Sequence, residues 1–324
     1  MAHGLNGFRA WLLACAMAGA APSAFAIVST SDAARTAGAG VSFLDAVAKL
    51  TVSRNDGTFV CSGSLLAGGA YVLTAAHCLT GESGTSTTSS VAVSFKSGSV
   101  TSTSTTFAVN GGWNGTFTAG NDLALVRLAS TVSGIGGYTL YDSSAQAGTV
   151  VIAGFGLTGT GQTGSVANTY GTLYYGSNQF DAPGGTTAGS NLYQGVTYSG
   201  IYLYDFDSGR GPGAFGSGGL GSIEALIAPG DSGGPSLLLS GGQYYLVGVH
   251  SFDSCFGRTC PVNSTFGEVA GDTSVFGQLS WIQGSMAAMS VAAVPEPGEW
   301  ALLAAGLGVV GLRARRRRAR TPAA

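Results

Sequence analysis

The sequence predicts an all-β protein, and three features of its 324 residues lead to this expectation. The apolar runs are short, and clusters of Gly, Ser, Asn and Asp separate them, which is the spacing of a β-sandwich or β-barrel. Only 9% of the chain is charged and 45% is hydrophobic, a composition that excludes a disordered protein. Glycine is abundant, at 54 residues, but follows no every-third-residue period, which excludes collagen.

The first 26 residues have the pattern of a secretory signal peptide. Arg9 supplies the positive charge, an apolar run covers residues 11–21, and Ala24-Phe25-Ala26 has the small-x-small form that signal peptidase accepts. A cytosolic N-terminal helix is the alternative. Cleavage after Ala26 would make Ile27 the first residue of the exported chain.

Short strands followed by one helix are expected between residues 27 and 293. The strands should form at the apolar runs 59–66, 71–75, 91–95, 123–128, 150–153 and 244–250. A helix should form at 274–286, where Val275, Leu279 and Ile282 recur at helical spacing.

Two Gly- and Ser-rich segments, 81–90 and 208–222, are predicted to be long loops. The second contains the sequence G-x-G-x-x-G at 211–216. Because Pro212 lies inside it and no amphipathic helix follows, we do not interpret it as a nucleotide-binding motif.

The charged residues are unevenly distributed. The segment 27–293 has seven basic and fourteen acidic residues, a net charge of about −7, which argues against nucleic acid as a partner. Six of the 14 Lys and Arg residues lie in the last twelve positions, at Arg313, Arg315, Arg316, Arg317, Arg318 and Arg320.

These arginines end a tail, 294–324, that has three parts in order. Val294-Pro295-Glu296-Pro297 is rigid, and an apolar run at 300–312 follows. At 1.5 Å per residue this run covers roughly 20 Å, less than the ~30 Å hydrocarbon core of a bilayer. The arginines would hold its end in the cytoplasm.

The tail resembles the PEP-CTERM sorting signal of Gram-negative bacteria. The resemblance implies cleavage near Pro295-Glu296-Pro297 by an exosortase-like enzyme. It also implies transient anchoring in the inner membrane and a final location at the cell surface or in the extracellular matrix. A permanent single-pass transmembrane anchor is the alternative.

Cysteine usage agrees with export. Cys15 would leave with the signal peptide, and an even number remains: Cys61, Cys78, Cys255 and Cys260. Four cysteines allow three pairings. A zinc site needs more Cys or His than these, so we predict no metal.

Three motifs carry the residue types of nucleophilic catalysis, in the order His, Asp, Ser. His77 follows an apolar run, Asp122 precedes another, and Ser232 lies in Gly-Asp-Ser-Gly-Gly-Pro at 230–235. A serine hydroxyl is a poor nucleophile at neutral pH and needs a base within hydrogen-bond reach. His77 is the better of two histidines in the body, and a carboxylate would fix its tautomer.

The motifs resemble those of the chymotrypsin-like serine peptidases. The resemblance continues through the segments 61–66, 154–156, 246–252 and 279–282. It implies two six-stranded Greek-key β-barrels with a C-terminal helix and the active site between them. We therefore expect an N-terminal barrel at 27–140 and a C-terminal barrel at 141–293.

The resemblance also implies the catalytic roles. Ser232 would be the nucleophile, His77 the general base and Asp122 the carboxylate that orients it. The N–H groups of Gly230 and Ser232 would form the oxyanion hole. The disulfide partner of Cys61 would be Cys78.

Two further implications concern activation and the second disulfide. Asp231 would bind the α-ammonium of Ile27 after cleavage, although Ser29 and Thr30 replace the family's glycines. Ala228 stands where the family commonly has a cysteine, so Cys255–Cys260 would be a local substitute.

The resemblance also implies the position of the specificity pocket, which is found by counting back from Ser232. This places its floor at Leu226, beside Ile227 and Ala228, and its wall at His250, Ser251 and Phe252. No acid stands at the floor, where the Arg- and Lys-selective members of the family carry one, so we predict no trypsin-like preference. We expect an apolar side chain at the cleavage site, rather than a glutamate bound by His250.

The sequence therefore predicts a secreted serine endopeptidase that acts on protein or peptide substrates, as a monomer and without a cofactor. One alternative is a non-enzymatic cell-surface or biofilm-matrix protein on a peptidase scaffold. A serine esterase is the other, since 230–234 fits G-x-S-x-G. Against the esterase, the α/β-hydrolase order is Ser, acid, His, and here histidine comes first.

Overall fold

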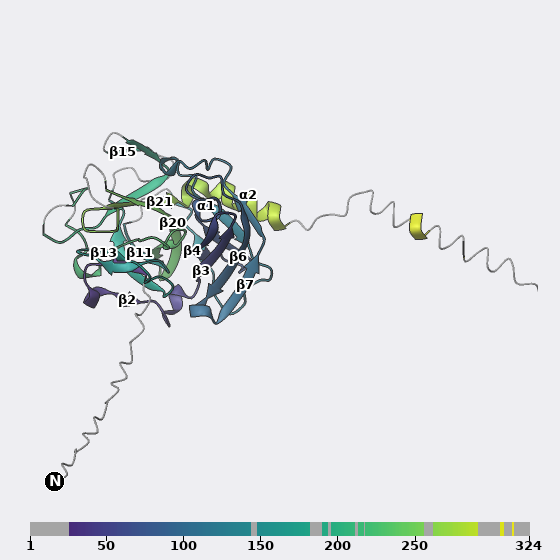
Figure 1. The fold of residues 1–324 in the computed structure, drawn as a ribbon, viewed down its shortest axis with the longest axis horizontal. Coiled ribbons are helices and arrows are strands. Elements are labelled where there is room, and N and C mark those ends of the chain that lie inside the picture. Colours follow the sequence, from purple (N-terminus) through teal and green to yellow (C-terminus); the bar gives the residue numbers. More distant parts are fainter. Residues whose placement is uncertain are drawn as a thin grey trace, which may run out of the picture.

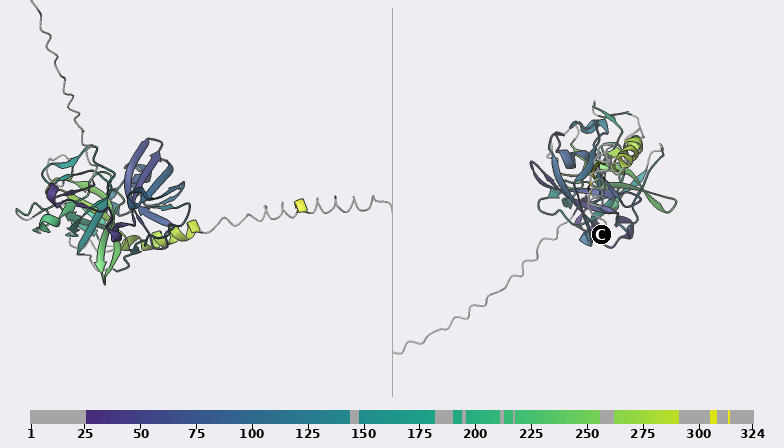
Figure 2. Two further views of the ribbon diagram at one scale, coloured as in Figure 1. Left: turned by 90° about the horizontal axis from the view of Figure 1, so that it is seen from below. Right: turned by 90° about the vertical axis from the view of Figure 1, so that its right-hand side faces the viewer.

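The computed structural model describes residues 26–143, 148–181, 190–193, 196–210, 213–216, 218–255, 262–290, 305–307 and 313. Within these residues the chain folds mainly into β-strands, arranged as two curled lobes side by side (Figures 1 and 2). The predicted all-β class is confirmed. All six predicted strands form, each within a few residues of its expected bounds.

The first barrel is a seven-stranded antiparallel sheet of order β7-β6-β3-β4-β5-β9-β8. Along β3, Leu50 and Val52 are buried and alternate with partly exposed residues, as expected for a sheet with one face on a core. Its strands are β3 (Val47–Arg54), β4 (Gly57–Leu65), β5 (Tyr71–Thr74), β6 (Thr88–Phe95), β7 (Val100–Ser104), β8 (Thr106–Val109) and β9 (Ala124–Arg127).

The second barrel combines two sheets and a hairpin. The larger sheet has the order β17-β21-β20-β19-β11-β14-β2, with β10 beside β20, and the smaller has the order β13-β12-β1-β18. The strands are β1 (Ile27–Ser29), β2 (Thr36–Ala37), β10 (Thr139–Leu140), β11 (Thr149–Gly154), β12 (Thr158–Thr160), β13 (Gly164–Val166), β14 (Tyr174–Gln179), β17 (Ile201–Asp205), β18 (Ala225–Leu226), β19 (Pro235–Ser240), β20 (Gln243–Ser254) and β21 (Val269–Ser274), and the hairpin is β15 (Ser190–Tyr193) with β16 (Val196–Ser199).

Helices are short and few in the described part of the chain. The α-helices are α1 (Ala76–Thr80) and α2 (Leu279–Ser290), and the 3-10 helices are η1 (Asp32–Ala34), η2 (Ser42–Leu44), η3 (Lys96–Gly98), η4 (Phe117–Ala119), η5 (Gly221–Ile223) and η6 (Phe276–Gln278). The predicted helix at 274–286 begins too early, because Ser274 still pairs with Gly248 as the last residue of β21. The predicted loop 81–90 ends at 87, where β6 follows.

The first two strands and the last helix each pack on the barrel that lies farther from them in the sequence. Strands β1 and β2 precede the first barrel in sequence but pair with strands of the second, β12, β18 and β14. Helix α2 follows the second barrel but packs on the first, where the Tyr71 hydroxyl donates to Met286 O at 2.9 Å (Figure 2). The expected boundaries 27–140 and 141–293 therefore need this correction at both ends.

The remaining segment predictions concern the chain ends. The signal peptide lies outside the described residues except for Ala26, as does the tail 294–324 except for residues 305–307 and 313. Among the helices that the structure describes, none has the length and apolar character needed to cross a membrane.

Candidate active site

A cleft of about 1210 Å³ is lined by residues of both barrels. The first barrel contributes β4 and the segment that contains His77, and the second contributes the segments 227–230 and 251–254 together with Ser232. The cleft is therefore where the separate sequence motifs meet.

His77 is held in this cleft by a buried carboxylate. Its Nδ1 lies 2.7 Å from Asp122 Oδ2, and its backbone N–H donates to Asp122 Oδ1 at 2.9 Å. The Ser251 hydroxyl donates to the same carboxylate at 2.6 Å. Asp122 is fully buried, so these bonds fix the carboxylate, and the carboxylate fixes the imidazole tautomer. The other ring nitrogen, Nε2, is left for chemistry.

The charges around His77 oppose its burial. Burial is the largest effect and lowers its pKa, because an imidazolium is poorly solvated there. The charge and hydrogen bond of Asp122, with the charge of Glu82, outweigh it, and Arg54 acts in the opposite direction to these two. The pKa of His77 consequently lies above its ordinary value.

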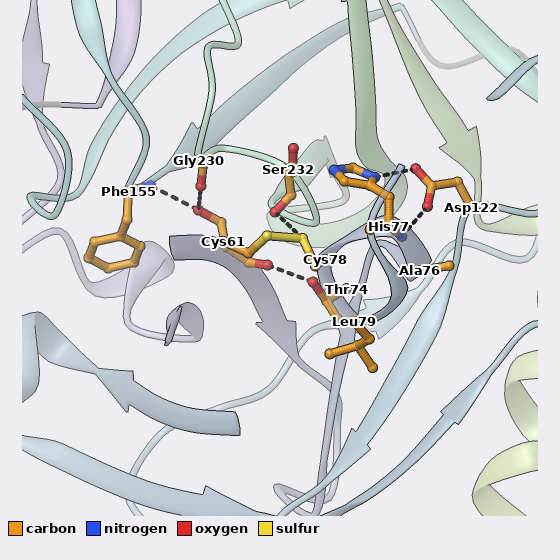
Figure 3. Close-up of a disulfide and its surroundings, with 12 residues drawn as sticks. Cys61, Thr74, Ala76, His77, Cys78, Leu79, Asp122, Phe155, Gly230 and Ser232 are labelled. Atoms are coloured by element: carbon orange, nitrogen blue, oxygen red, sulfur yellow. Dashed lines mark hydrogen bonds and ion pairs between the residues drawn. A yellow bond between two sulfur atoms is a disulfide. The ribbon is translucent and has the colours of Figure 1, made fainter. Parts of the chain in front are cut away.

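Ser232 lies on the opposite side of the imidazole from Asp122 (Figure 3). The backbone around it is tied to the first barrel: Ser62 N–H donates to Ser232 O at 2.9 Å, and the Ser62 hydroxyl donates to Gly230 O at 3.0 Å. The described residues include no hydrogen bond between Ser232 Oγ and His77 Nε2. Such bonds are often long in ligand-free enzymes and tighten with substrate.

Glycine is required on both sides of Ser232. Gly230 and Gly233 have φ values of +98° and +81°, in the region that favours glycine. A Cβ on Gly233 would lie 2.0 Å from Thr74 Oγ1 and 2.5 Å from Ser62 O, so only glycine allows this loop to approach the first barrel. The N–H groups of Gly230 and Ser232 donate to no described acceptor, and both residues line the cleft.

Asp231 points away from the cleft, toward Ile27. Its carboxylate accepts hydrogen bonds from the backbone N–H groups of Ile27 at 3.3 Å, Gly156 at 2.8 Å and Ala228 at 2.9 Å. Burial raises its pKa to about 7, although these bonds and the charge of His250 lower it. The predicted pair of Ile27 and Asp231 is thus brought together.

The predicted pocket residues divide into two groups. Ile227, Ser251 and Phe252 line the cleft, but Leu226 and His250 do not. Leu226 is fully buried because β18 pairs with β1, opposite Val28. His250 is also fully buried, with Nδ1 3.0 Å from Asp272 Oδ1.

Asp272 is a buried residue that the sequence analysis did not identify. It accepts hydrogen bonds from the hydroxyls of Tyr204 at 2.9 Å and Ser236 at 2.5 Å, besides its contact with His250. This network lies behind the cleft wall, and no motif in the sequence marks it.

Two aromatic residues of the cleft also lie outside every sequence motif. Phe117 has its ring centroid 5.5 Å from that of His77 and 6.0 Å from that of Phe252, and Tyr198 stacks on Phe252 at 6.1 Å. Phe117 lies in the three-residue 3-10 helix η4 and Tyr198 on the four-residue strand β16, and segments this short have too little pattern to be predicted from the sequence.

The disulfide prediction is confirmed where the structure tests it. Cys61 and Cys78 are joined, with sulfurs 2.02 Å apart, and this bond attaches α1 to β4 next to His77 (Figure 3). Cys255 is also disulfide-bonded, and Cys260 lies outside the described residues. No cluster of three or more metal-ligating side chains occurs among the described residues.

Two mainly antiparallel β-barrels with a cleft at their junction are the architecture of the two-barrel serine proteases. The family model described as "Trypsin" matches residues 36–209, which is more than half of the chain, and the chain therefore belongs to the trypsin family. The matched range includes His77 and Asp122 and ends before Ser232.

A solved structure titled as an HL collagenase has the same fold. Its TM-score is 0.52 and its sequence identity 21%, and the alignment covers 75% of this chain and 94% of that chain. At this identity the similarity is evidence for the fold alone. No curated protein sequence matches the chain.

Proposed function

We propose that this protein is an exported serine endopeptidase that cleaves peptide bonds through an acyl-enzyme. The observation that supports this proposal most directly is the arrangement in the cleft. A buried Asp122 holds the Nδ1 side of His77, and Ser232 lies on the other side of the ring. Membership of the trypsin family supports the same reaction class.

In the proposed reaction the Ser232 hydroxyl attacks the substrate carbonyl, and His77 Nε2 takes its proton. Asp122 stabilises the imidazolium that forms. The free N–H groups of Gly230 and Ser232 bind the oxyanion, and each such donor lowers the barrier by about 3–4 kcal/mol. His77 then returns the proton to the leaving amine, and water repeats the sequence to release the acid.

Activation would use the contact between Ile27 and Asp231. In the uncleaved chain Ile27 has φ +60°, which is strained for a β-branched residue. Cleavage after Ala26 would remove that dihedral and convert the amide into an ammonium, which is a stronger partner for the buried carboxylate. Ala26 is itself fully buried, so this cut must precede folding. N-terminal sequencing of active protein tests the step, and a start beyond Thr30 would contradict it.

Substrate preference follows from what lines the cleft. Ile227 and Ala228 present apolar surface there, whereas His250 is removed from it and Asp253 would repel an acidic side chain. We therefore propose cleavage after medium or large apolar residues rather than after glutamate.

Export and sorting form a separate part of the proposal. Its support is the signal peptide pattern at 1–26 and the three-part tail at 294–324. The exported enzyme would be anchored in the inner membrane by the tail, released by an exosortase-like enzyme and delivered to the cell surface. Replacing Pro295-Glu296-Pro297 by alanines should then retain the protein in the inner membrane. A mature protein that still contains Trp300 would show a permanent anchor instead.

A direct test of the catalytic function is labelling with a fluorophosphonate, followed by cleavage-site mapping on a peptide library. We expect one label on Ser232, lost in Ser232→Ala, and hydrolysis of internal peptide bonds. Labelling with ester hydrolysis alone would indicate an esterase. The absence of both would indicate a non-enzymatic protein on a peptidase scaffold.

A further inference from the structure

Arg54 is the last residue of β3, and its side chain reaches the helix that holds His77. Its Nη1 donates to the backbone carbonyls of His77 at 3.0 Å and Cys78 at 3.1 Å. The side chain is only 8% exposed and contributes to the cleft lining. No sequence motif includes this residue.

These two carbonyls need an external donor. The last four C=O groups of an α-helix have no partner within the helix, and α1 has only five residues, Ala76–Thr80. A cation at a helix C-terminus also interacts favourably with the helix dipole. Arg54 therefore supplies both the hydrogen-bond donor and the positive charge that α1 needs, at the carbonyls of His77 and the disulfide-bonded Cys78.

The guanidinium is itself held on three sides. Its Nε and Nη2 donate to the two carboxylate oxygens of Asp56 at 2.8 and 3.2 Å, and Ser86 donates to the same carboxylate at 2.7 Å. The ring of Phe59 lies 3.7 Å from the guanidinium carbon. A bidentate, stacked guanidinium is directional, which a lysine ammonium is not.

We propose that Arg54 is a positioning residue for His77, which fixes the backbone of the catalytic base by binding its carbonyl while Asp122 binds its amide and ring. The inference rests on the proposed function of the cleft. Together the two side chains hold both polar groups of the His77 backbone, so the ring keeps its place as Ser232 reacts.

The effect of the Arg54 charge on the pKa of His77 provides a second measurement, which a folding defect alone would not reproduce. The charged groups that act on His77 are Asp122 and Glu82, which raise its pKa, and Arg54, which lowers it. Loss of the Arg54 charge should raise that pKa further. Because the base must be neutral to accept a proton, the acid limb of the pH–rate profile should move to higher pH.

The experiment compares Arg54→Gln and Arg54→Lys with wild type in the full chain, measuring kcat and kcat/KM across pH with one peptide substrate. Arg127→Gln is the matched control. Arg127 lies on β9 and donates to Met289 O of α2 at 2.5 Å, so it also binds a helix C-terminus, but away from the cleft.

For Arg54→Gln we expect kcat to fall on the order of tenfold, as for a small displacement of a catalytic group, and the acid limb to rise by about 0.5 pH unit. Arg54→Lys should lower kcat but leave the acid limb of the pH–rate profile unchanged, since lysine keeps the positive charge but lacks the bidentate guanidinium. Arg127→Gln should change neither.

An unchanged kcat and acid limb in folded Arg54→Gln would overturn the inference, as would an equal limb shift in Arg127→Gln. If Arg54→Gln does not fold, Arg54→Lys decides: a lower kcat supports the role, and a wild-type kcat removes it. A wild-type protein without hydrolysis or labelling would instead refute the proposed function.

Discussion

The two barrels differ in what they bury. Within the described residues, Asp122 is the one fully buried carboxylate of the first barrel, and three donors satisfy it. The second barrel buries six, Asp205, Asp207, Glu224, Asp231, Glu268 and Asp272. The first barrel thus buries one carboxylate, which binds His77, whereas the second has several buried carboxyl groups. The pH dependence of stability should consequently come mainly from the second barrel.

The largest effect should come from changing the proposed catalytic residues, which the two barrels together contribute to the cleft. Ser232→Ala or His77→Ala should lower kcat by roughly 10⁶, and the double variant no further, because the two act as a unit. Asp122→Asn should cost about 10⁴ by favouring the wrong tautomer. Steady-state kinetics on one peptide substrate measures all of these. If Ser232→Ala cleaves as well as wild type, the assignment is wrong.

The disulfide should stabilise the first barrel specifically. Cys61 and Cys78 are 17 residues apart, and closing a loop of this size stabilises the fold by about 3 kcal/mol. Replacing both by alanine should reduce the free energy of unfolding by that order in a urea titration. Cys255→Ala is the comparison in the second barrel. Equal free energies of unfolding for wild type and the double variant would contradict this prediction.

The pH dependence of stability should come mainly from the second barrel. Burial and the charge of Asp205 raise the pKa of Asp181 to about 8, and burial raises that of Glu224 to about 7. An unfolded carboxyl has a pKa of about 4, so the folded state binds more protons between these values. Stability contributed by these groups is therefore lost as pH rises from about 4 to 8.

Calorimetry of Asp181→Asn tests this sign. Between pH 5 and 8 the Tm of the variant should fall by about 2–4 °C less than the Tm of wild type. Asp56→Asn provides the opposite control in the first barrel, because the hydrogen bond from Arg54 lowers the pKa of Asp56. Its contribution is lost as pH falls. A wild-type Tm that rises between pH 5 and 8 would argue against the assignment.

The smallest effect should follow from changing His250. Because His250 is buried behind the cleft wall against Asp272, His250→Val should leave the ratio of cleavage after Phe, Tyr, Leu and Glu unchanged. Peptide-library profiling measures this ratio. Selective loss of cleavage after Glu would show that the imidazole reaches substrate and would reverse the proposed preference.

The sequence predicted the fold class and the strands because each strand has a local apolar pattern. It also predicted the contact of His77 with Asp122 and that of Ile27 with Asp231, through motifs that resemble a family. The sequence did not predict the contact of Arg54 with His77. A side chain that binds backbone carbonyls 23 residues away leaves no pattern in residue type.

The pocket prediction failed at Leu226 and His250 for a related physical reason. Counting residues gives the position of a segment but not the direction of each side chain, and strands alternate between two faces. Leu226 and His250 are buried in the second barrel, whereas Ile227, just beyond the end of β18, and Ser251, at a register shift of β20, line the cleft. The end of a strand and a register shift depend on strand pairing, which only the tertiary structure shows.

The packing of β1, β2 and α2 on the barrel farther from them in the sequence has a consequence for how the chain can be divided. A cut in the connection 129–138 would produce two fragments, each lacking an element that the other carries. The later fragment would lack β1 and β2, and the earlier would lack α2, including Ile282, whose side chain is buried in a hydrophobic cluster formed mainly by the first barrel. Neither half is a self-sufficient module. Hydrolytic activity from the two separately made halves would arise only on mixing, with a second-order dependence on their concentrations.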